Sequence, residues 1–596
     1  MGISGLSQFV QAHSSIGTRV DWNPSTTIKD RFFFDGNAFA HQLRQDWLHG
    51  GNYAKIAQIV TETIAQLKVA GIEPVFLFDG ALPEDKISTR KNRKNNSIKS
   101  CTLVMTQLDQ INRGLVYVDP SLFLISPWTL EVVIQILRDL QVRLQVCDFE
   151  ADGELVRLAE KENGYVVSKD SDMFVYPRIG KGYIPLDSLR VNKPVTAQVF
   201  HPDRLARLLK LDTGDLPLLG ALMGNDYMEK KIWRSVIEDW NFQRGMIKRQ
   251  WPMTVAEFIN QQKNGQLIQN IVRFAPSKKR PELESGLLNA IDKYNIESMS
   301  DKTTVCEGLS RLLTDVIMNQ TLWTGIFLED IRKESSWNIS QELRQAIYEI
   351  QREKLQLEEY KVTEYIRTKQ HLDAVKICSR KRTGEDWDWF TELHYSKNIT
   401  NLSEKPSGLC YLILCLRYMI HQCSSKVEPL ADHEVIAITL STLRCLAPCL
   451  GFEESRTPQL EETPALSRRS IHLSAQYQAV VHSSYLLSQM LDIQIQAPLV
   501  HLYNGPYFHY CLERTRDGDS LGSLLSDTSS EFKTLFTYAY KLITQDMNIQ
   551  RVFDYTMDTL SNEKPKRIIT QKKTTPPAKK SKLTLSNNPF DLLDIV

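Results

Sequence analysis

The sequence lacks a marked net charge, an internal repeat and a long hydrophobic run. Its 72 Lys and Arg residues balance 71 Asp and Glu residues, so the global charge identifies no partner, and any signal for nucleic-acid binding must be local. The most apolar run, Leu409–Leu416, has eight residues, too few to span a bilayer. We therefore expect a soluble protein with no membrane partner.

Cysteine is scarce, with ten residues scattered through a chain of 596 that begins without a secretory leader. This usage is typical of thiols that stay reduced in the cytosol or nucleus. Only Cys410, Cys415, Cys445 and Cys449 invite a zinc interpretation. Their spacings differ from those of a usual zinc finger, and Cys415 lies within the apolar run, so we favour thiols packed in a core.

The first quarter of the chain alternates strand-like and helix-like segments. Apolar segments predict strands at Phe32–Phe34, Val75–Phe78, Val142–Cys147 and Tyr165–Ser168. Helical spacing of apolar residues predicts helices at Tyr53–Ala70, Trp128–Leu140 and Gly153–Lys161. Such alternation predicts an α/β fold with a central, mostly parallel sheet covered on both faces.

After about Phe242 the character of the sequence changes. Strand signals become sparse, and helices are predicted over Val305–Gln320, Gln341–Lys361 and Gly408–Gln422. Between Ser561 and Leu583 eight Lys and Arg residues stand against one acid, a composition too polar to fold alone. We predict three parts: an α/β domain over 1–241, a mostly helical region over 242–560 and a disordered basic tail over 561–596.

Acidic residues recur where the predicted strands end. A single Asp after a strand is commonly a turn or helix-capping residue, but recurrence at four consecutive strand ends favours a shared site. Because the carboxyl ends of parallel strands lie along one edge of a sheet, these side chains are expected to gather there. They are Asp35, Asp79, the pair Glu150 and Asp152, and the pair Asp170 and Asp172.

So many carboxylates along one edge would repel one another unless cations lay among them. Magnesium prefers oxygen ligands and is typically shared between a few carboxylates and a substrate phosphate. Two such ions, roughly 4 Å apart, activate water and stabilise the leaving oxygen of an in-line displacement. The sequence therefore predicts hydrolysis of a phosphodiester with two Mg²⁺ ions, for which Mn²⁺ could substitute.

A run of basic residues follows Asp79. It contains no acid after Asp85, and its members are Lys86, Arg90, Lys91, Arg93, Lys94 and Lys99. Lys86 and Arg93 are seven residues apart and share one face of a helix, which could grip the scissile phosphate. We predict catalytic roles for these two and substrate binding by Arg90, Lys91 and Lys94. The alternative is a solvated charge run.

These motifs, with the opening Met-Gly-Ile-Ser-Gly-Leu and the segment Leu-Met-Gly-Asn-Asp226-Tyr, resemble the flap endonuclease and xeroderma pigmentosum group G superfamily. The resemblance implies a PIN-like nuclease domain with Lys86 and Arg93 as its basic pair. It also implies that Gly2 packs beside the active centre once Met1 is removed. The implied metal ligands are Asp35, Asp79, Glu150, Asp152, Asp170, Asp172 and Asp226.

The sequence departs from that superfamily after Asp226, where the glycine-rich hairpin that binds duplex DNA is missing. The Gly-Asn-Asp-Tyr segment and the long helical region are similar to the asteroid branch. That likeness implies a structure-specific DNA endonuclease of the nucleus that acts in repair on single-stranded or overhanging DNA.

Two other functions are open to the same sequence. A non-catalytic PIN-like scaffold that regulates RNA or translation would have lost several acids, whereas all seven positions hold Asp or Glu. A phosphatase could use Asp170 and Asp172 as its nucleophile motif, but Asp35 and the pair Glu150 and Asp152 would then be unexplained.

Three further segments carry possible contacts. The aromatic cluster Asp386–Phe390 is either a base-stacking platform or, as we favour, part of a core or a partner surface. Lys579, Lys580 and Lys582 follow two prolines and predict a nuclear import signal, with a solubilising or phosphate-tethering tail as the alternative. A protein partner could bind the helical region or the terminal peptide around Asn588–Phe590.

Overall fold

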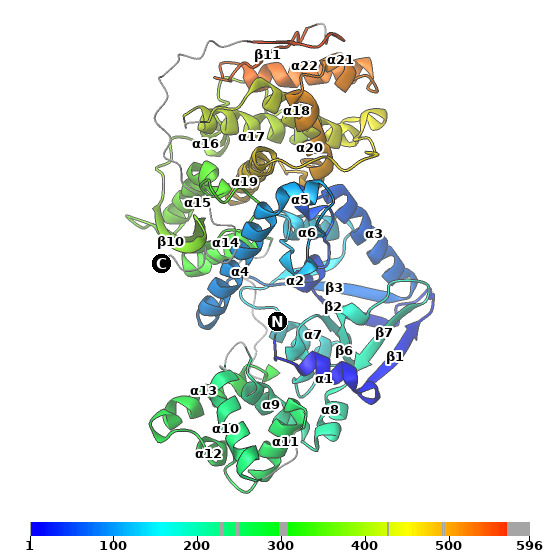
Figure 1. The fold of residues 1–596 in the computed structure, drawn as a ribbon, viewed down its shortest axis with the longest axis vertical. Helices are drawn as coiled ribbons and strands as arrows, with labels where there is room; N and C mark the ends of the chain where they lie inside the picture. Colours follow the sequence, from blue (N-terminus) through cyan, green and yellow to red (C-terminus); the bar gives the residue numbers. More distant parts are fainter. Residues whose placement is uncertain are drawn as a thin grey trace.

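The computed structural model describes residues 2–225, 228, 230–244, 249–296, 308–425, 428–491, 493, 495–558 and 560–568. The molecule is elongated, and its parts follow one another along the long axis in an order that differs from their order in the sequence (Figure 1). Helices of the C-terminal part, which comprises the described residues from 308 to 568, fill one end of the molecule. A sheet occupies the middle, and helices between residues 202 and 292 fill the other end. Asp226 and the tail beyond Ile568, with the predicted signal Lys579, Lys580 and Lys582, lie outside the described residues.

The central sheet has seven strands in the order β1-β7-β6-β5-β2-β3-β4. The five central and adjoining strands β6, β5, β2, β3 and β4 run parallel, whereas β7 pairs antiparallel with both β6 and β1. The mostly parallel sheet predicted from the sequence is therefore confirmed. The strand bounds are β1 Gly17–Trp22, β2 Asp30–Asp35, β3 Ile72–Phe78, β4 Arg143–Val146, β5 Tyr165–Ser168, β6 Gly182–Pro185 and β7 Val195–Phe200.

Alternate residues of the central strands face two different cores, as the period of a pleated strand requires. Phe32, Phe34 and Phe76 belong to the core shared with α2, α3 and α6. Phe33 and Val75 belong to the core shared with α1, α7 and α9. Because both faces are covered, these strands are apolar throughout. The helices are α1 Leu6–Ala12, α2 Gly36–Ala40, α3 Tyr53–Val69, α6 Thr129–Asp139, α7 Asp152–Lys161 and α9 Leu216–Met223.

The second core continues into the helices that follow the sheet. Residues from Ile3 to Tyr294 contribute to it, so the packing does not break at residue 241. Helices α11 and α13 contact α9, which joins this end of the molecule to the sheet. The helices here are α8 Pro202–Leu209, α10 Lys230–Gln243, α11 Trp251–Gln261, α12 Leu267–Val272 and α13 Arg280–Asp292.

The C-terminal part is mainly helical but carries a small sheet. Its strands β8 Thr321–Trp323, β9 Lys361–Thr368 and β10 His371–Cys378 pair in the order β10-β9-β8. The predicted helix Gln341–Lys361 ends at Lys354, because the chain turns there and enters β9. The helices are α14 Arg311–Asn319, α15 Gln341–Lys354, α16 Asp386–Leu393, α17 Ser407–Ser424, α18 Asp432–Leu446, α19 Arg468–Met490, α20 Gly505–Arg516, α21 Leu521–Leu524 and α22 Ser530–Thr544. A short ribbon, β11 Phe553–Asp554 and β12 Lys566–Arg567, completes it.

One segment of this part, Asp432–Leu450, has the length and mean hydropathy of a membrane-spanning helix. In the fold 72% of that window is buried, and α18 packs against α17, α20 and α22. It therefore occupies the position of a core helix.

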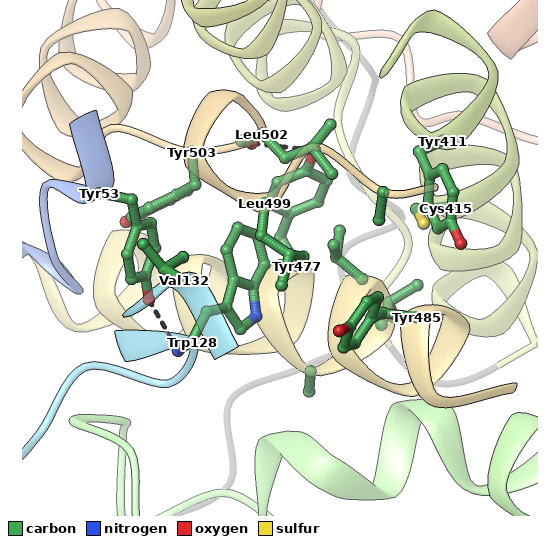
Figure 2. Close-up of a cluster of buried hydrophobic side chains, with 14 of the residues drawn as sticks. Tyr53, Trp128, Val132, Tyr411, Cys415, Tyr477, Tyr485, Leu499, Leu502 and Tyr503 are labelled. Atoms are coloured by element: carbon green, nitrogen blue, oxygen red, sulfur yellow. Dashed lines mark hydrogen bonds between the residues drawn. The ribbon is translucent and has the colours of Figure 1, made fainter. Parts of the chain in front are cut away.

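The C-terminal part and the sheet domain share a core (Figure 2). Trp128, ahead of α6, stacks on Tyr53 of α3 with ring centres 5.0 Å apart, and both side chains are fully buried. The Trp128 indole donates a hydrogen bond to the Gln478 carbonyl of α19 at 3.0 Å, and Tyr53 Oη donates to Gln478 Oε1 at 2.7 Å. Tyr503 closes the cluster beside both rings. The C-terminal part therefore covers the start of α3 and the residue before α6.

Candidate active site

Carboxylates from four neighbouring strand ends meet at one pocket of about 340 Å³. Asp35 ends β2, Asp79 follows β3, and the other acids follow β4 and β5. These strands are adjacent in the order β5-β2-β3-β4, so their carboxyl ends form a continuous edge. The predicted acids that line the pocket are Asp35, Asp79, Glu150, Asp152 and Asp170.

Two of these carboxylates, Asp35 and Asp79, accept hydrogen bonds from other segments of the chain. Asp35 Oδ1 accepts from the Ala38 backbone at 2.9 Å and so caps α2, while Asp35 Oδ2 accepts from Ser168 Oγ of β5 at 2.7 Å. Asp79 Oδ1 accepts from the backbone N–H of Ala151 at 3.1 Å. These bonds tie together the ends of β2, β3 and β5 and the start of α7.

The carboxylates lie close enough to disfavour one another's ionisation. Burial, followed by the charge of Asp79, raises the pKa of Asp35 to about 7. Burial also raises the pKa of Asp152 well above its ordinary value, and the other four acids of the pocket add to the rise. A cation among them would relieve this repulsion and keep them ionised.

The donor set fits a magnesium ion, because it consists of carboxylate oxygens with no thiol or imidazole among the predicted ligands. In the described part of the chain, no three His, Cys, Asp or Glu side chains are grouped so that they could hold a metal ion. Magnesium keeps several water ligands, so it needs fewer direct ligands from the protein than such a group provides. The residues that would hold it are Asp35, Asp79, Glu150, Asp152 and Asp170.

Asp172 and Gly2 lie beside Asp170, next to this pocket. Gly2 has φ +78°, and a β-carbon at this position would overlap Asp170 Oδ1 and lie 2.8 Å from Asp172 Oδ1. Only glycine therefore fits against these carboxylates without displacement. Asp172 Oδ2 accepts a hydrogen bond from Tyr294 Oη at 3.1 Å, and Tyr294 Oη accepts from Asn225 at 3.0 Å. The seventh predicted acid, Asp226, follows Asn225 and lies outside the described residues.

The predicted basic helix also lines the pocket. It is α4 Ile87–Thr106, preceded by a short 3₁₀ turn that carries Lys86. Four of its predicted bases line the pocket: Lys86, Arg90, Arg93 and Lys94. Lys91 points elsewhere, with its Nζ 5.3 Å from the centre of the Tyr365 ring. Lys86 is only 7% exposed, and its Nζ lies 2.5 Å from Glu150 Oε1.

The C-terminal part holds α4 in place. Lys94 Nζ donates to the Thr324 carbonyl at 2.6 Å, and the Leu372 backbone N–H donates to Asn95 Oδ1 at 3.2 Å. Nearer the end of the helix, Arg468 donates to the Met105 carbonyl at 2.7 Å. The basic helix is therefore positioned by contacts that lie more than 200 residues away in sequence.

The C-terminal part also supplies side chains to the pocket that sequence reasoning missed. No motif marks them, and each lies far in sequence from the acids that share the pocket, so only the fold reveals them. His41, which follows α2, was missed as well. The contributions of the C-terminal part include Arg311, Asp315, Trp323, Phe327, Trp337 and His482.

Two features of the C-terminal part take the structural role favoured from the sequence. Cys410 and Cys415 are buried free thiols of α17, as expected of thiols packed in a core. Cys449, by contrast, is exposed. In the aromatic cluster of α16, Trp389 and Phe390 are each 1% exposed, which excludes these two rings as a base-stacking surface in this fold.

Comparison with known proteins places the chain among nuclease-related families. Residues 1–100 match the family described as XPG N-terminal domain, and residues 125–378 match the family described as XPG domain containing. Single-strand DNA endonuclease ASTE1 of Homo sapiens is 22% identical over 91% of this chain and 90% of its own length. Protein asteroid of Drosophila melanogaster is 30% identical over 33% of this chain and 22% of its own. Among solved structures, the catalytic core of Rad2 in complex with DNA substrate matches with 19% identity and a TM-score of 0.31, covering 52% of this chain and 92% of that one.

Proposed function

Because the chain belongs to the asteroid-type branch of the XPG and flap endonuclease superfamily, we propose that it is a magnesium-dependent endonuclease that cuts single-stranded or overhanging DNA. One observation carries the proposal. Five carboxylates from four strand ends converge on a single pocket that is also lined by four basic side chains, three from α4 and Lys86 from the turn before it. Acids to hold cations and bases to hold phosphate are what hydrolysis of a phosphodiester requires.

The acidic residues of the pocket would bind the metal, and the basic residues would contact the phosphate. When bound, magnesium would supply an activated water and stabilise the leaving oxygen. Asp35, Asp79, Glu150, Asp152 and Asp170 would hold it, with Asp172 and Asp226 added by resemblance to the superfamily. Lys86 and Arg93 neutralise charge that grows on the phosphate, which is worth most in the transition state.

One finding supports a single strand as substrate: the protein named single-strand DNA endonuclease ASTE1 is similar to this chain over nearly its whole length. Hydrogen bonds between α4 and the C-terminal part, at Lys94 and Asn95, hold the basic side chains of α4 beside the carboxylates.

The experiment that tests the proposal is a cleavage assay on a panel of labelled DNAs. Purified protein with Mg²⁺ is incubated with single strands, overhangs, flaps, hairpins and blunt duplexes of the same sequence, and the products are sized. We expect internal cuts in the single-stranded segments and none in the blunt duplex. Binding to the single strand without cutting would instead favour the non-catalytic scaffold, and preference for an RNA strand would move the substrate class to RNA.

We also propose that the protein acts in the nucleus, in DNA repair. The support is the basic sequence at Lys579, Lys580 and Lys582, together with the likeness to the asteroid branch. A protein partner that binds the C-terminal part, or the terminal peptide at Asn588–Phe590, would bring the nuclease to damaged DNA.

A further inference from the structure

Arg311, the first residue of α14 in the C-terminal part, lines the carboxylate pocket. In the view of Figure 1, α14 is drawn next to α4. Arg311 Nε donates to the carbonyl oxygen of Gly80 at 3.4 Å, and Gly80 directly follows Asp79. The guanidinium group is therefore at the edge of the sheet where the acids gather. Arg90 and Lys94 of α4 line the same pocket.

Among the described residues, none of these three cations forms an ion pair with a carboxylate, although the charges of Asp79 and Asp315 act on them. In the part of the chain that the structure describes, neither Arg90 nor Arg311 has a carboxylate within ion-pair distance. Lys94 Nζ donates to a backbone carbonyl, that of Thr324. Burial and then Arg90 and Arg311 lower the pKa of Lys94 to about 7, and burial and then Arg311 lower that of Arg90. A guanidinium nevertheless stays charged, because its pKa starts far above neutrality.

The acid nearest in sequence to Arg311 is already engaged. Asp315, one turn further along α14, is 2% exposed, and its Oδ1 accepts a hydrogen bond from the Leu82 backbone at 2.7 Å. Two carboxylates, Asp79 and Asp315, thus act on the three cations, and each already accepts a backbone hydrogen bond. Clustered like charges that lack partners destabilise a fold, and they persist where an anion binds.

We propose that Arg311 binds a backbone phosphate of the substrate, with Arg90 and Lys94 completing an anion subsite beside the carboxylates. The planar guanidinium suits this role because it can give two parallel hydrogen bonds to one phosphate. That the anion is a nucleic-acid phosphate rests on the proposed function. The phosphate contacts of the pocket then come from both α4 and α14. The C-terminal part, which contains α14, therefore takes part in substrate binding.

The test is the affinity of a fluorescein-labelled oligothymidylate, measured by anisotropy in EDTA over a range of salt concentrations. We expect Arg311→Ala to weaken binding about tenfold at moderate salt, the loss of one charged hydrogen-bonded contact. The slope of log affinity against log salt should fall by about 0.7, since one phosphate contact to a single strand is lost. Arg311→Lys should keep the slope but recover only part of the affinity. Arg516→Ala, an exposed arginine of α20 outside this pocket, is the matched control and should change neither quantity.

The outcomes separate this inference from the proposed function. If the wild-type protein cuts DNA while Arg311→Ala and Arg311→Lys bind with wild-type affinity and slope, the nuclease stands and the Arg311 subsite is wrong. If the wild type binds the strand with the predicted dependence on Arg311 but never cuts it, the subsite stands and the nuclease proposal fails. A fall in affinity with an unchanged salt slope would also contradict the subsite, because it would indicate a structural role.

Discussion

Lys86 Nζ lies 2.5 Å from Glu150 Oε1, so a predicted catalytic cation is ion-paired with a predicted metal ligand. The basic and acidic sides of the pocket are therefore joined by a charge pair. Lys86 is nearly buried, which makes the pair stronger than one on the surface. This pair links the start of the basic helix to the acidic edge of the sheet. Replacement of Lys86 therefore tests what it contributes to cleavage.

Replacement of Lys86 or Arg93 by Ala should lower turnover by about 100-fold while changing substrate affinity little, because the charge that each offsets develops in the transition state. The measurement is single-turnover cleavage of a labelled single strand at several enzyme concentrations. Lys99→Ala, an exposed base further along α4, is the control. If affinity falls and turnover does not, both residues are general contacts to the DNA backbone.

Replacement of Asp152 by Asn should stabilise the metal-free protein by an amount on the order of 1 kcal/mol. Burial and four neighbouring acids disfavour the ionised carboxylate, and the amide removes that repulsion at similar volume. The measurement is thermal unfolding in EDTA, with Asp109→Asn on the exposed side of α5 (Leu108–Asn112) as the control. A lower melting temperature for Asp152→Asn than for the wild type would show that the acids do not repel one another in the folded protein.

The sheet domain and the C-terminal part should unfold together. Trp128→Ala removes a fully buried ring that stacks on Tyr53 and bonds to Gln478, and we expect a loss of about 3–5 kcal/mol in the free energy of unfolding. Trp128→Phe keeps the ring and should lose less. Urea unfolding followed by circular dichroism and by fluorescence tests this. Two separate transitions, only one of them shifted by Trp128→Ala, would contradict a shared core.

Replacement of Lys579, Lys580 and Lys582 by Ala should move a tagged protein from the nucleus to the cytoplasm, because an import receptor reads exposed basic side chains. Microscopy of cells expressing each version provides the measurement. If the variant stays nuclear and only its salt-sensitive affinity for nucleic acid falls, the tail is a tether to phosphates.

The elements that carry the acids could be predicted from the sequence because their packing is local and regular. The helix expected over Tyr53–Ala70 is α3 Tyr53–Val69, and the strand Tyr165–Ser168 has the predicted bounds. Near-continuous apolar strands ending in Asp35 and Asp79 suffice to predict a parallel sheet with acids along one edge.

The rest depended on contacts distant in sequence. Strand β10 is mostly exposed, so it carries no strong apolar alternation, and the small sheet that contains it was not predicted. The predicted helix Gln341–Lys361 is too long: α15 ends at Lys354, and Leu355 and Leu357, which follow it, are exposed. Arg311 reaches the pocket because α14 packs on the sheet domain. No sequence motif near Arg311 predicts this packing.

The most direct test of the carboxylate centre is the Mg²⁺-dependent cleavage of a labelled single-stranded DNA by the wild type and by Asp79→Asn. This substitution keeps an oxygen to accept the hydrogen bond from Ala151 while it removes the charge that would hold the metal. We predict that the wild type cuts with Mg²⁺ or Mn²⁺ and stops in EDTA, and that Asp79→Asn, folded and able to bind the strand, loses at least about 100-fold in rate. Cleavage by Asp79→Asn at the wild-type rate, or wild-type cleavage that persists in EDTA, would contradict the account.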